Sequence, residues 1–188
     1  TVRREFSTAP ERLIADVLLP TMSEVGDRWE RGRIEIYEEH LASEAVRGLL
    51  ASLPALLPWK PRDIGRTALI SCAPGDQHGL IPLALSAYLE IRGWRTRNLG
   101  GSLPADQIIR AAAALKADAL FLTFTMLFLL EGLLEVLDGV RRAIPSCKVI
   151  IGGRGTLSSR ALLEGRGAFV SDSFDHGHRM ALEERQHA

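Results

Sequence analysis

The chain has no excess of charge of either sign. It contains 23 Lys and Arg residues and 23 Asp and Glu residues, so its formal net charge is zero at pH 7. A domain that holds DNA by itself needs a basic face, and no dense run of basic residues is present. Arg92, Arg95 and Arg97 are close in sequence, but they flank an expected strand and form solvated edges. The composition therefore argues against a self-sufficient DNA-binding domain.

Cysteine is scarce, and no apolar run is long enough to span a membrane. Cys72 and Cys147 are too few and too far apart for a disulfide framework, and neither has the spacing of a metal ligand. The longest apolar stretch, 117–134, contains Asp118 and Glu131 and fits a buried strand that feeds a helix. No signal peptide is visible. We therefore expect a cytoplasmic protein with reduced thiols and no membrane segment.

Several enzyme motifs are also missing. The chain has no Gly-x-x-x-x-Gly-Lys phosphate loop, no Gly-x-Gly-x-x-Gly after the first expected strand, no His-Glu-x-x-His and no Gly-x-Ser-x-Gly elbow. A response-regulator site needs an acidic cluster after the first strand, which Asp76 alone does not supply. His176 and His178 flank a single residue and could chelate a metal at an exposed tail. We predict that the chain is not an enzyme.

The first third of the chain predicts a helical cap, which is part of a helix bundle. Helices are expected over 11–29 and 34–53, and Pro10 suits the first turn of the first one. An apolar stripe on the second helix contains Ile34, Tyr37, Leu41, Ala45, Leu49 and Leu53. A proline-rich linker covers 54–63. We expect the cap over residues 1–57 and a second domain over residues 62–188.

The rest of the chain alternates between apolar strands and helices. Strands are expected near 67–72, 95–99, 119–123, 148–151 and 168–171, and helices near 79–92, 104–116, 130–143, 157–163 and 175–185. This alternation predicts an α/β fold with a doubly wound, five-stranded parallel sheet of the Rossmann-like, flavodoxin-like kind. Ligands of such sheets bind beyond the carboxyl ends of the strands, where the strand order reverses. The segments that follow the strands are therefore the expected ligand site.

A histidine with a nearby carboxylate follows the first expected strand. Asp76-Gln77-His78-Gly79 stands between the apolar run 67–72 and a helix-like stretch. This arrangement offers one axial imidazole ligand, with a carboxylate two residues earlier to orient the far ring nitrogen and raise the basicity of the ring. The tetrapeptide is the strongest indication of a binding site in the chain.

Further motifs stand at the ends of the later strands. Ser102 and Leu103 follow the second strand, Thr123-Phe124-Thr125 ends the third, and Gly152-Gly153 ends the fourth. With Asp76 and His78 they resemble the cobalamin-binding domain, whose pattern is Asp-x-His-x-x-Gly, then Ser-x-Leu or Ser-x-Thr, then Gly-Gly. Ile81 stands where the pattern has Gly and narrows the expected slot near its mouth.

The resemblance implies how cobalamin is held. His78 replaces the cofactor's own dimethylbenzimidazole on cobalt, and the freed nucleotide tail runs into a slot between the sheet and its helices. Thr123 and Thr125 supply hydroxyls to that slot. Gly152 and Gly153 let the chain approach the tail closely, because they have no Cβ.

A second resemblance lies in the cap. Trp29, followed after nine residues by Glu39-His40, resembles the helical cap of light-sensing cobalamin regulators of the CarH/LitR type. In that family the Trp packs against the 5′-deoxyadenosyl group on the upper face of cobalt, and the Glu and His line the same pocket. A flat indole suits stacking on a nucleoside. The resemblance implies adenosylcobalamin as the cofactor.

Three functions are compatible with these motifs. The first is a photosensory domain that regulates transcription, forms a homo-oligomer and contacts DNA only through a domain outside this chain or through a partner protein. The second is a corrinoid carrier of a methyltransferase system. The third is a degenerate domain that has lost cobalamin or binds another tetrapyrrole such as haem. Trp29 with Glu39-His40 favours the first over the second, and Ile81 is the main argument for the third.

Overall fold

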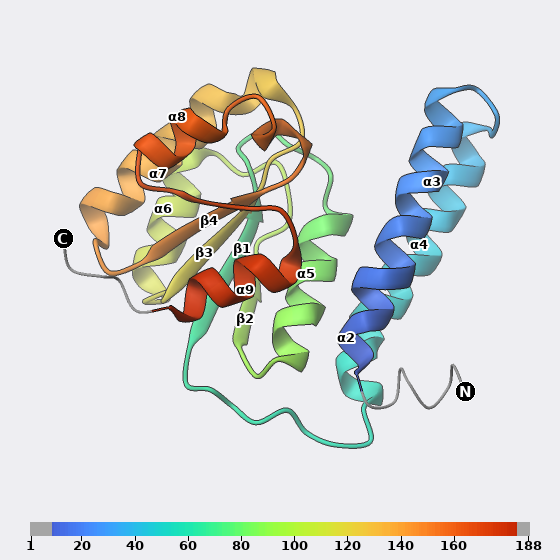
Figure 1. Cartoon of the computed structure of the whole chain (residues 1–188), viewed down its shortest axis with the longest axis horizontal. Helices are drawn as coiled ribbons and strands as arrows, with labels where there is room; N and C mark the ends of the chain where they lie inside the picture. The colour runs from blue at the N-terminus through green and yellow to red at the C-terminus, as the bar shows by residue number, and fades with distance from the viewer. Residues whose placement is uncertain (1–8, 184–188) are drawn as a thin grey trace.

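The computed structural model describes residues 9–183, in which a pair of long helices precedes a five-stranded parallel sheet (Figure 1). The first rod of the pair is continuous from α2 (Pro10–Arg12) through the π-helical segment η1 (Leu13–Leu18) to α3 (Leu19–Glu30). Pro20 lies in the first turn of α3, within the continuous rod. A proline inside a helix has no N–H to donate, and in a regular α-helix its ring would crowd the carbonyl four residues earlier. The wider π-helical turn directly before it accommodates this proline.

The chain reverses at Gly32, which has a φ of +63°. The second rod consists of α4 (Ile36–Ser52) and the short 3₁₀ helix η2 (Leu53–Leu56). Glu35 and Glu38 form a capping box at the start of α4, and the Glu35 N–H donates to the Glu38 carboxylate at 2.8 Å. These contacts satisfy two of the backbone N–H groups that a helix start leaves open, and so they set where α4 begins.

The sheet has the strand order β2-β1-β3-β4-β5, and all of its pairs are parallel. Its strands are β1 (Thr67–Cys72), β2 (Arg95–Asn98), β3 (Ala119–Thr123), β4 (Lys148–Gly152) and β5 (Phe169–Ser171). The predicted fold class is therefore confirmed. The strand order reverses between β1 and β3, and ligands of open α/β sheets bind at that point.

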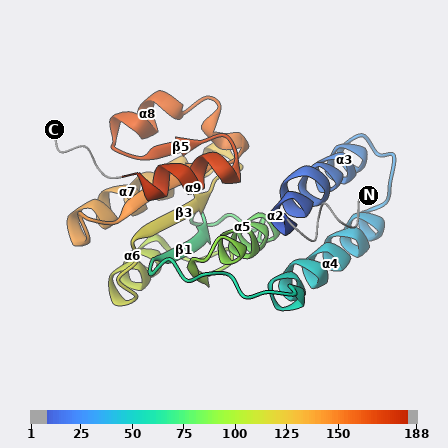
Figure 2. The ribbon, with the colours of Figure 1, turned by 60° about the horizontal axis from the view of Figure 1, so that its bottom comes forward.

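Helices cover both faces of the sheet (Figure 2). The helices of this part are α5 (Leu80–Ile91), α6 (Ala105–Ala114), α7 (Leu130–Ala143), α8 (Arg160–Gly165) and α9 (Phe174–Leu182), with 3₁₀ turns η3 (Leu127–Leu129) and η4 (Arg154–Thr156). Leu69 of β1 packs with α6 and α7, whereas its neighbour Ile70 packs with α5 on the opposite face. Because both faces are buried, the central strands read as continuous apolar runs.

The cap packs on the sheet domain through its lower half. Ile14, Leu50 and Leu53 are buried in the same core cluster as α5, which lies between the cap and the sheet (Figure 1). The upper half of the cap is more exposed to solvent, and α3 has no buried residue. The apolar stripe predicted on the second helix is mostly not covered in this structure, since Leu53 is buried but Tyr37 and Leu41 are 62% and 67% exposed.

Within residues 9–183, no helix has the length and apolar character needed to cross a membrane.

Candidate functional site

Asp76 is the centre of a hydrogen-bonded cluster at the switch point of the sheet. It follows β1 and is 2% exposed. Its Oδ1 lies 3.0 Å from the backbone nitrogen and 2.6 Å from the ring Nδ1 of His78. Its Oδ2 accepts from Thr125, at 3.2 Å from the backbone N–H and 2.5 Å from the hydroxyl. One buried carboxylate therefore joins the loops that follow β1 and β3.

The hydrogen bonds keep this carboxylate ionised. Burial raises the pKa of Asp76, but hydrogen bonds from the Thr125 hydroxyl and from the backbone and ring of His78 outweigh it and hold the pKa below its usual value. An ionised carboxylate can only accept hydrogen bonds, so the proton on the His78 ring must sit on Nδ1. The His78 side chain is 52% exposed, and Nε2 is the ring nitrogen that can donate to a metal.

The loop after β2 packs directly on this cluster. The Ser102 N–H donates to the Asp76 carbonyl at 2.9 Å, and Ser102 has a φ of +60°, which is uncommon outside glycine. A Cβ added at Gly101 would lie 2.6 Å from the same carbonyl oxygen. A glycine is therefore required where the two loops meet, although sequence patterns did not single out Gly101. Leu103 next to Ser102 is partly buried against the core.

Thr123 ends β3 with a buried hydroxyl. Its Oγ1 has no hydrogen bond of normal geometry within the described part of the chain. Cys72 is its register partner on β1 and places a thiol nearby, but a thiol is a weak hydrogen-bonding group. Buried hydroxyls are usually satisfied, so an unsatisfied one at the ligand edge of the sheet suits a bound group with polar atoms.

Of the two glycines at the end of β4, Gly153 has a local structural reason. Gly153 has a φ of +117°, and a Cβ there would lie 2.4 Å from the Phe124 carbonyl oxygen. A Cβ at Gly152 would lie 3.4 Å from the Ser171 carbonyl oxygen, which is ordinary contact. Gly153 is therefore demanded by its backbone conformation and by its packing on the segment after β3. That Gly152 and Gly153 let the chain approach a cofactor tail closely stays a prediction.

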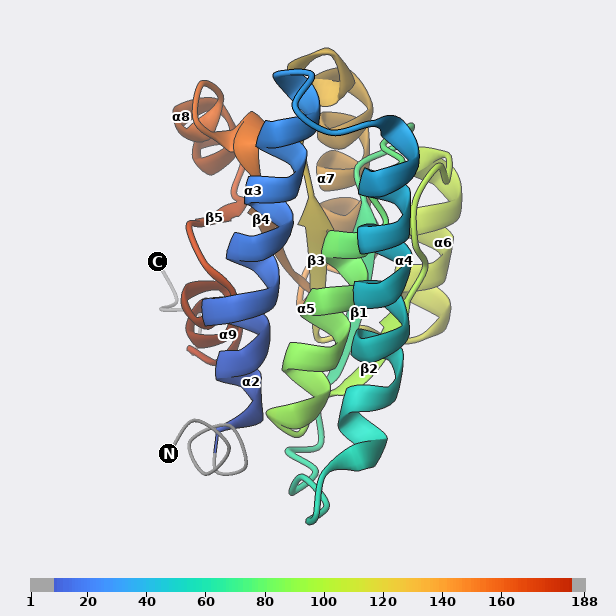
Figure 3. The ribbon, with the colours of Figure 1, turned by 90° about the vertical axis from the view of Figure 1, so that its right-hand side faces the viewer.

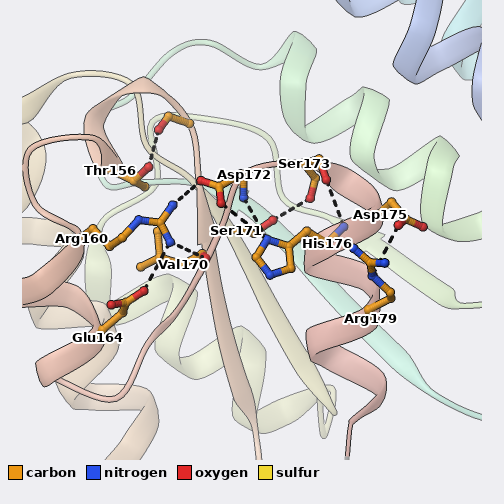
Figure 4. A network of polar contacts seen from close by, with 11 residues as sticks. Thr156, Arg160, Glu164, Val170, Ser171, Asp172, Ser173, Asp175, His176 and Arg179 are labelled. Atoms are coloured by element: carbon orange, nitrogen blue, oxygen red, sulfur yellow. Dashed lines mark hydrogen bonds and ion pairs between the residues drawn. The ribbon is translucent and has the colours of Figure 1, made fainter.

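The end of β5 adds polar groups that the sequence patterns did not single out. Figure 4 shows Ser171, Asp172 and Ser173 gathered with His176 where β5 passes into α9. The Ser171 hydroxyl donates to the Ser173 carbonyl at 2.6 Å, and the Ser173 hydroxyl accepts from the His176 N–H at 3.1 Å. Ser171 is also the register partner of Gly152. The signal for this segment was the run Ser-Asp-Ser directly after an apolar strand.

The predicted cap residues lie near the turn between α3 and α4, at the same end of the molecule as the starts of α5 and α7 (Figure 3). Trp29 is 45% exposed. On α4 the Glu39 carboxylate lies 3.0 Å from Nδ1 of His40 and accepts from the Ser43 hydroxyl at 2.6 Å. The cap thus presents an exposed indole and a Glu–His pair at the end where the strands of the sheet finish.

The structure brings four of the predicted site residues into contact with one another. Asp76, His78, Ser102 and Thr125 form one contact cluster. Gln77 is exposed, and Gly79 is the N-cap of α5 with ordinary space around it.

The two histidines of α9 do not converge on a metal site. Nδ1 of His178 is buried and accepts from the Trp94 indole, whereas Nδ1 of His176 accepts from the Asp172 N–H. No group of three His, Cys, Asp or Glu side chains within residues 9–183 could hold a metal ion.

Comparison with known proteins identifies the class. The family description "B12 binding domain" matches residues 2–53 and, in a second part, residues 66–175. The chain belongs to this family.

Its relatives include regulators and corrinoid proteins. The HTH-type transcriptional repressor CarH of Myxococcus xanthus is 31% identical over 92% of this chain, which spans 57% of that protein. The dimethylamine corrinoid protein of Methanosarcina barkeri is 26% identical over 77% of this chain and 69% of its own length. The solved monomethylamine corrinoid protein of Methanosarcina barkeri superposes with a TM-score of 0.70 at 22% identity, over 88% of this chain and 79% of that one. That last likeness concerns the fold alone.

The residues present fit a cobalt corrinoid. They supply one imidazole with a fixed tautomer that would bind the metal, and at the end of β3 an unsatisfied buried hydroxyl on Thr123 that would meet polar atoms of the cofactor.

Proposed function

We propose that this chain is a photosensory domain that binds adenosylcobalamin with His78 as the lower axial ligand and regulates transcription. The observation that carries the proposal is the 2.6 Å contact between the buried Asp76 carboxylate and Nδ1 of His78 at the switch point of the sheet. Bound adenosylcobalamin would supply a cobalt–carbon bond that light can break. The chain's own residues hold the cofactor and respond to its upper ligand.

On the lower side, Asp76 and Thr125 fix the ring of His78. Asp76 keeps the proton on Nδ1, so Nε2 has a free lone pair for cobalt. Thr125 donates its hydroxyl to Asp76 and thereby limits how the carboxylate can turn. Thr123 offers its hydroxyl to the nucleotide tail.

On the upper side, we assign Trp29, Glu39 and His40 to the adenosyl group. An exposed indole gains large contact area when a nucleoside stacks on it. A ligand can change the position of the cap only if it binds the two arrangements with different affinities. The adenosyl contact with Trp29 is therefore the element that light would switch.

A corrinoid carrier of a methyltransferase system is the second candidate. It is favoured by the 26% identity to a dimethylamine corrinoid protein and uses the same lower half of the site. The cap residues Trp29, Glu39 and His40 and the 31% identity to a transcriptional repressor favour the photosensor.

The decisive experiment is a visible absorption spectrum of the protein with adenosylcobalamin, in the dark and after green light. We expect a base-off, histidine-bound spectrum in the dark that changes irreversibly on illumination. His78→Ala removes the histidine-bound spectrum and leaves the fold intact, because His78 lies in an exposed loop. His176→Ala, at another part of the same sheet edge, is the matched control. A spectrum unaffected by His78→Ala would rule out His78 as the ligand, and absence of any cobalamin binding would favour a degenerate domain.

The output we propose is a change of assembly. We expect a homo-oligomer with adenosylcobalamin in the dark and a smaller species after illumination, with DNA contacted by a domain outside this chain or by a partner protein. Light scattering on the full-length protein measures the mass in both states. Equal masses would rule out assembly as the output.

A further inference from the structure

The cap is anchored to the α/β domain at its lower end. Ile14, Leu50 and Leu53 lie in the core cluster of α5, and Glu11 lies 3.4 Å from the guanidinium of Arg92, the C-cap residue of that helix. Burial of apolar side chains makes this end the stable one.

The upper end of the cap is held by charge. The guanidinium of Arg154 lies 3.3 Å from the Asp27 carboxylate and 3.9 Å from the Glu30 carboxylate. Among residues 9–183, both ion pairs that join α3 to the α/β domain come from this one arginine. Asp27 and Glu30 flank Trp29 on α3.

Arg154 stands on a rigid part of the sheet edge. It directly follows Gly153, whose backbone packs against the Phe124 carbonyl, and the Gly155 N–H donates to the same carbonyl at 3.0 Å. The segment that carries Arg154 is therefore tied to the segment after β3, which also carries Thr125. The two ion pairs span the distance between the cap and the edge where the strands end.

We infer that Arg154 is a positioning residue that holds the upper end of α3, and with it Trp29, over the carboxyl edge of the sheet. The cap is then hinged at its apolar base and closed at its top by ion pairs. Exposed ion pairs of this kind are weak, and Arg154 is 66% exposed. Loss of these ion pairs should change the ratio of closed to open cap by about two- to fivefold. Because this difference is small, a ligand that binds one arrangement of the cap more tightly can shift the equilibrium toward it.

The test measures the distance between cap and sheet edge in the protein without cofactor. Spin labels are attached at Arg33→Cys in the turn after α3 and at Leu157→Cys, two exposed positions, while the native Cys72 and Cys147 are buried. Arg154→Glu places a carboxylate opposite Asp27 and Glu30, and we expect the distance distribution to shift toward longer separations. Adding Asp27→Arg to that variant should restore the short distances.

Arg28→Glu is the matched control, because Arg28 pairs with Glu24 on its own helix and carries the same charge change. It should leave the distribution unchanged. A distribution in Arg154→Glu equal to that of the wild type, or no restoration by Asp27→Arg, would overturn the inference.

The consequence for the cofactor rests on the proposed function. We expect Arg154→Glu to lower the affinity for adenosylcobalamin by about two- to fivefold and to leave the affinity for hydroxocobalamin unchanged, since only the larger upper ligand reaches the cap. Equal weakening of both cobalamins would show that Arg154 does not act through the cap. If the wild type itself does not prefer adenosylcobalamin, the proposed function fails, and the label distances still decide the role of Arg154.

Discussion

Replacing Asp76 by Asn tests the central contact of the site. The wild-type carboxylate accepts four hydrogen bonds, two from His78 on Oδ1 and two from Thr125 on Oδ2. An amide of the same shape has one acceptor oxygen and one donor nitrogen. If the nitrogen faces Thr125, it opposes a backbone N–H. If it faces His78, the ring must take its proton on Nε2 and loses the lone pair that cobalt needs.

The magnitude follows from the lost bonds. Charge-assisted hydrogen bonds contribute about 1.5–3 kcal/mol each, and the Thr125 hydroxyl can rotate to recover part of the loss. We expect Asp76→Asn to reduce the free energy of unfolding by about 2–4 kcal/mol, which lowers Tm by roughly 5–15 °C in a chain of this size. Because Asp76 orients the histidine that would bind the metal, Asp76→Asn should lower the affinity for adenosylcobalamin by about ten- to a hundredfold.

The measurements are urea unfolding of the cofactor-free protein and titration with adenosylcobalamin. Asp63→Asn is the control, because Asp63 also accepts from a backbone N–H and from Arg95 but is exposed, and it should lose less stability. The folded-state pKa of Asp76 is lowered, so its contribution is present above the unfolded value of 3.8 and is lost as the pH falls toward the folded value. Asp76→Asn should lack that part of the acid dependence. An unchanged unfolding midpoint together with unchanged affinity would refute the reasoning.

Four further changes have separate expectations. Trp29→Ala should weaken adenosylcobalamin by about 1–3 kcal/mol and hydroxocobalamin much less, as titrations with both cobalamins would measure, because only the nucleoside stacks on the indole. Thr123→Val should leave the stability of the cofactor-free protein unchanged or raised in urea unfolding, because it removes an unsatisfied buried hydroxyl, while cobalamin affinity falls. Gly101→Ala should reduce stability in the same assay by about 1–3 kcal/mol, because its Cβ would meet a backbone oxygen at 2.6 Å. Stability measured against pH should fall below about pH 6.5, because burial lowers the folded-state pKa of His178 and the unfolded chain then binds the extra proton.

Each of these expectations has a control or a contradicting result. Trp59→Ala removes another exposed indole outside the helical cap and should affect both cobalamins equally little. Gly79→Ala should be nearly neutral, because its Cβ would meet its nearest neighbour at 3.9 Å. His178→Gln should flatten the pH dependence, since glutamine can still accept from the Trp94 indole without titrating in this range. A destabilising Thr123→Val would mean that the hydroxyl has a partner in solution, most simply the Cys72 thiol.

Much of the fold follows from local patterns. The strands of the sheet were predicted within one residue at every end. The central strands are short continuous apolar runs because they are buried on both faces, as in β3 (Ala119–Thr123), whereas β2 (Arg95–Asn98) is polar and follows from its place in the strand–helix alternation. The position of Asp76 and His78 at the ligand edge follows from the same pattern, since a loop after a parallel strand must lie at that edge.

Tertiary structure alone decided which side chains meet. Thr125 reaches Asp76 across 49 residues, and Arg154 reaches Asp27 across 127 residues. No periodicity within a helix or strand encodes such pairs, because they depend on how the β3 and β4 loops and the cap are arranged in space. The exposure of Tyr37 and Leu41 is also decided by tertiary packing and not by local periodicity. A stripe on a helix states that one face is apolar, but only the packing of the whole chain determines whether that face is covered.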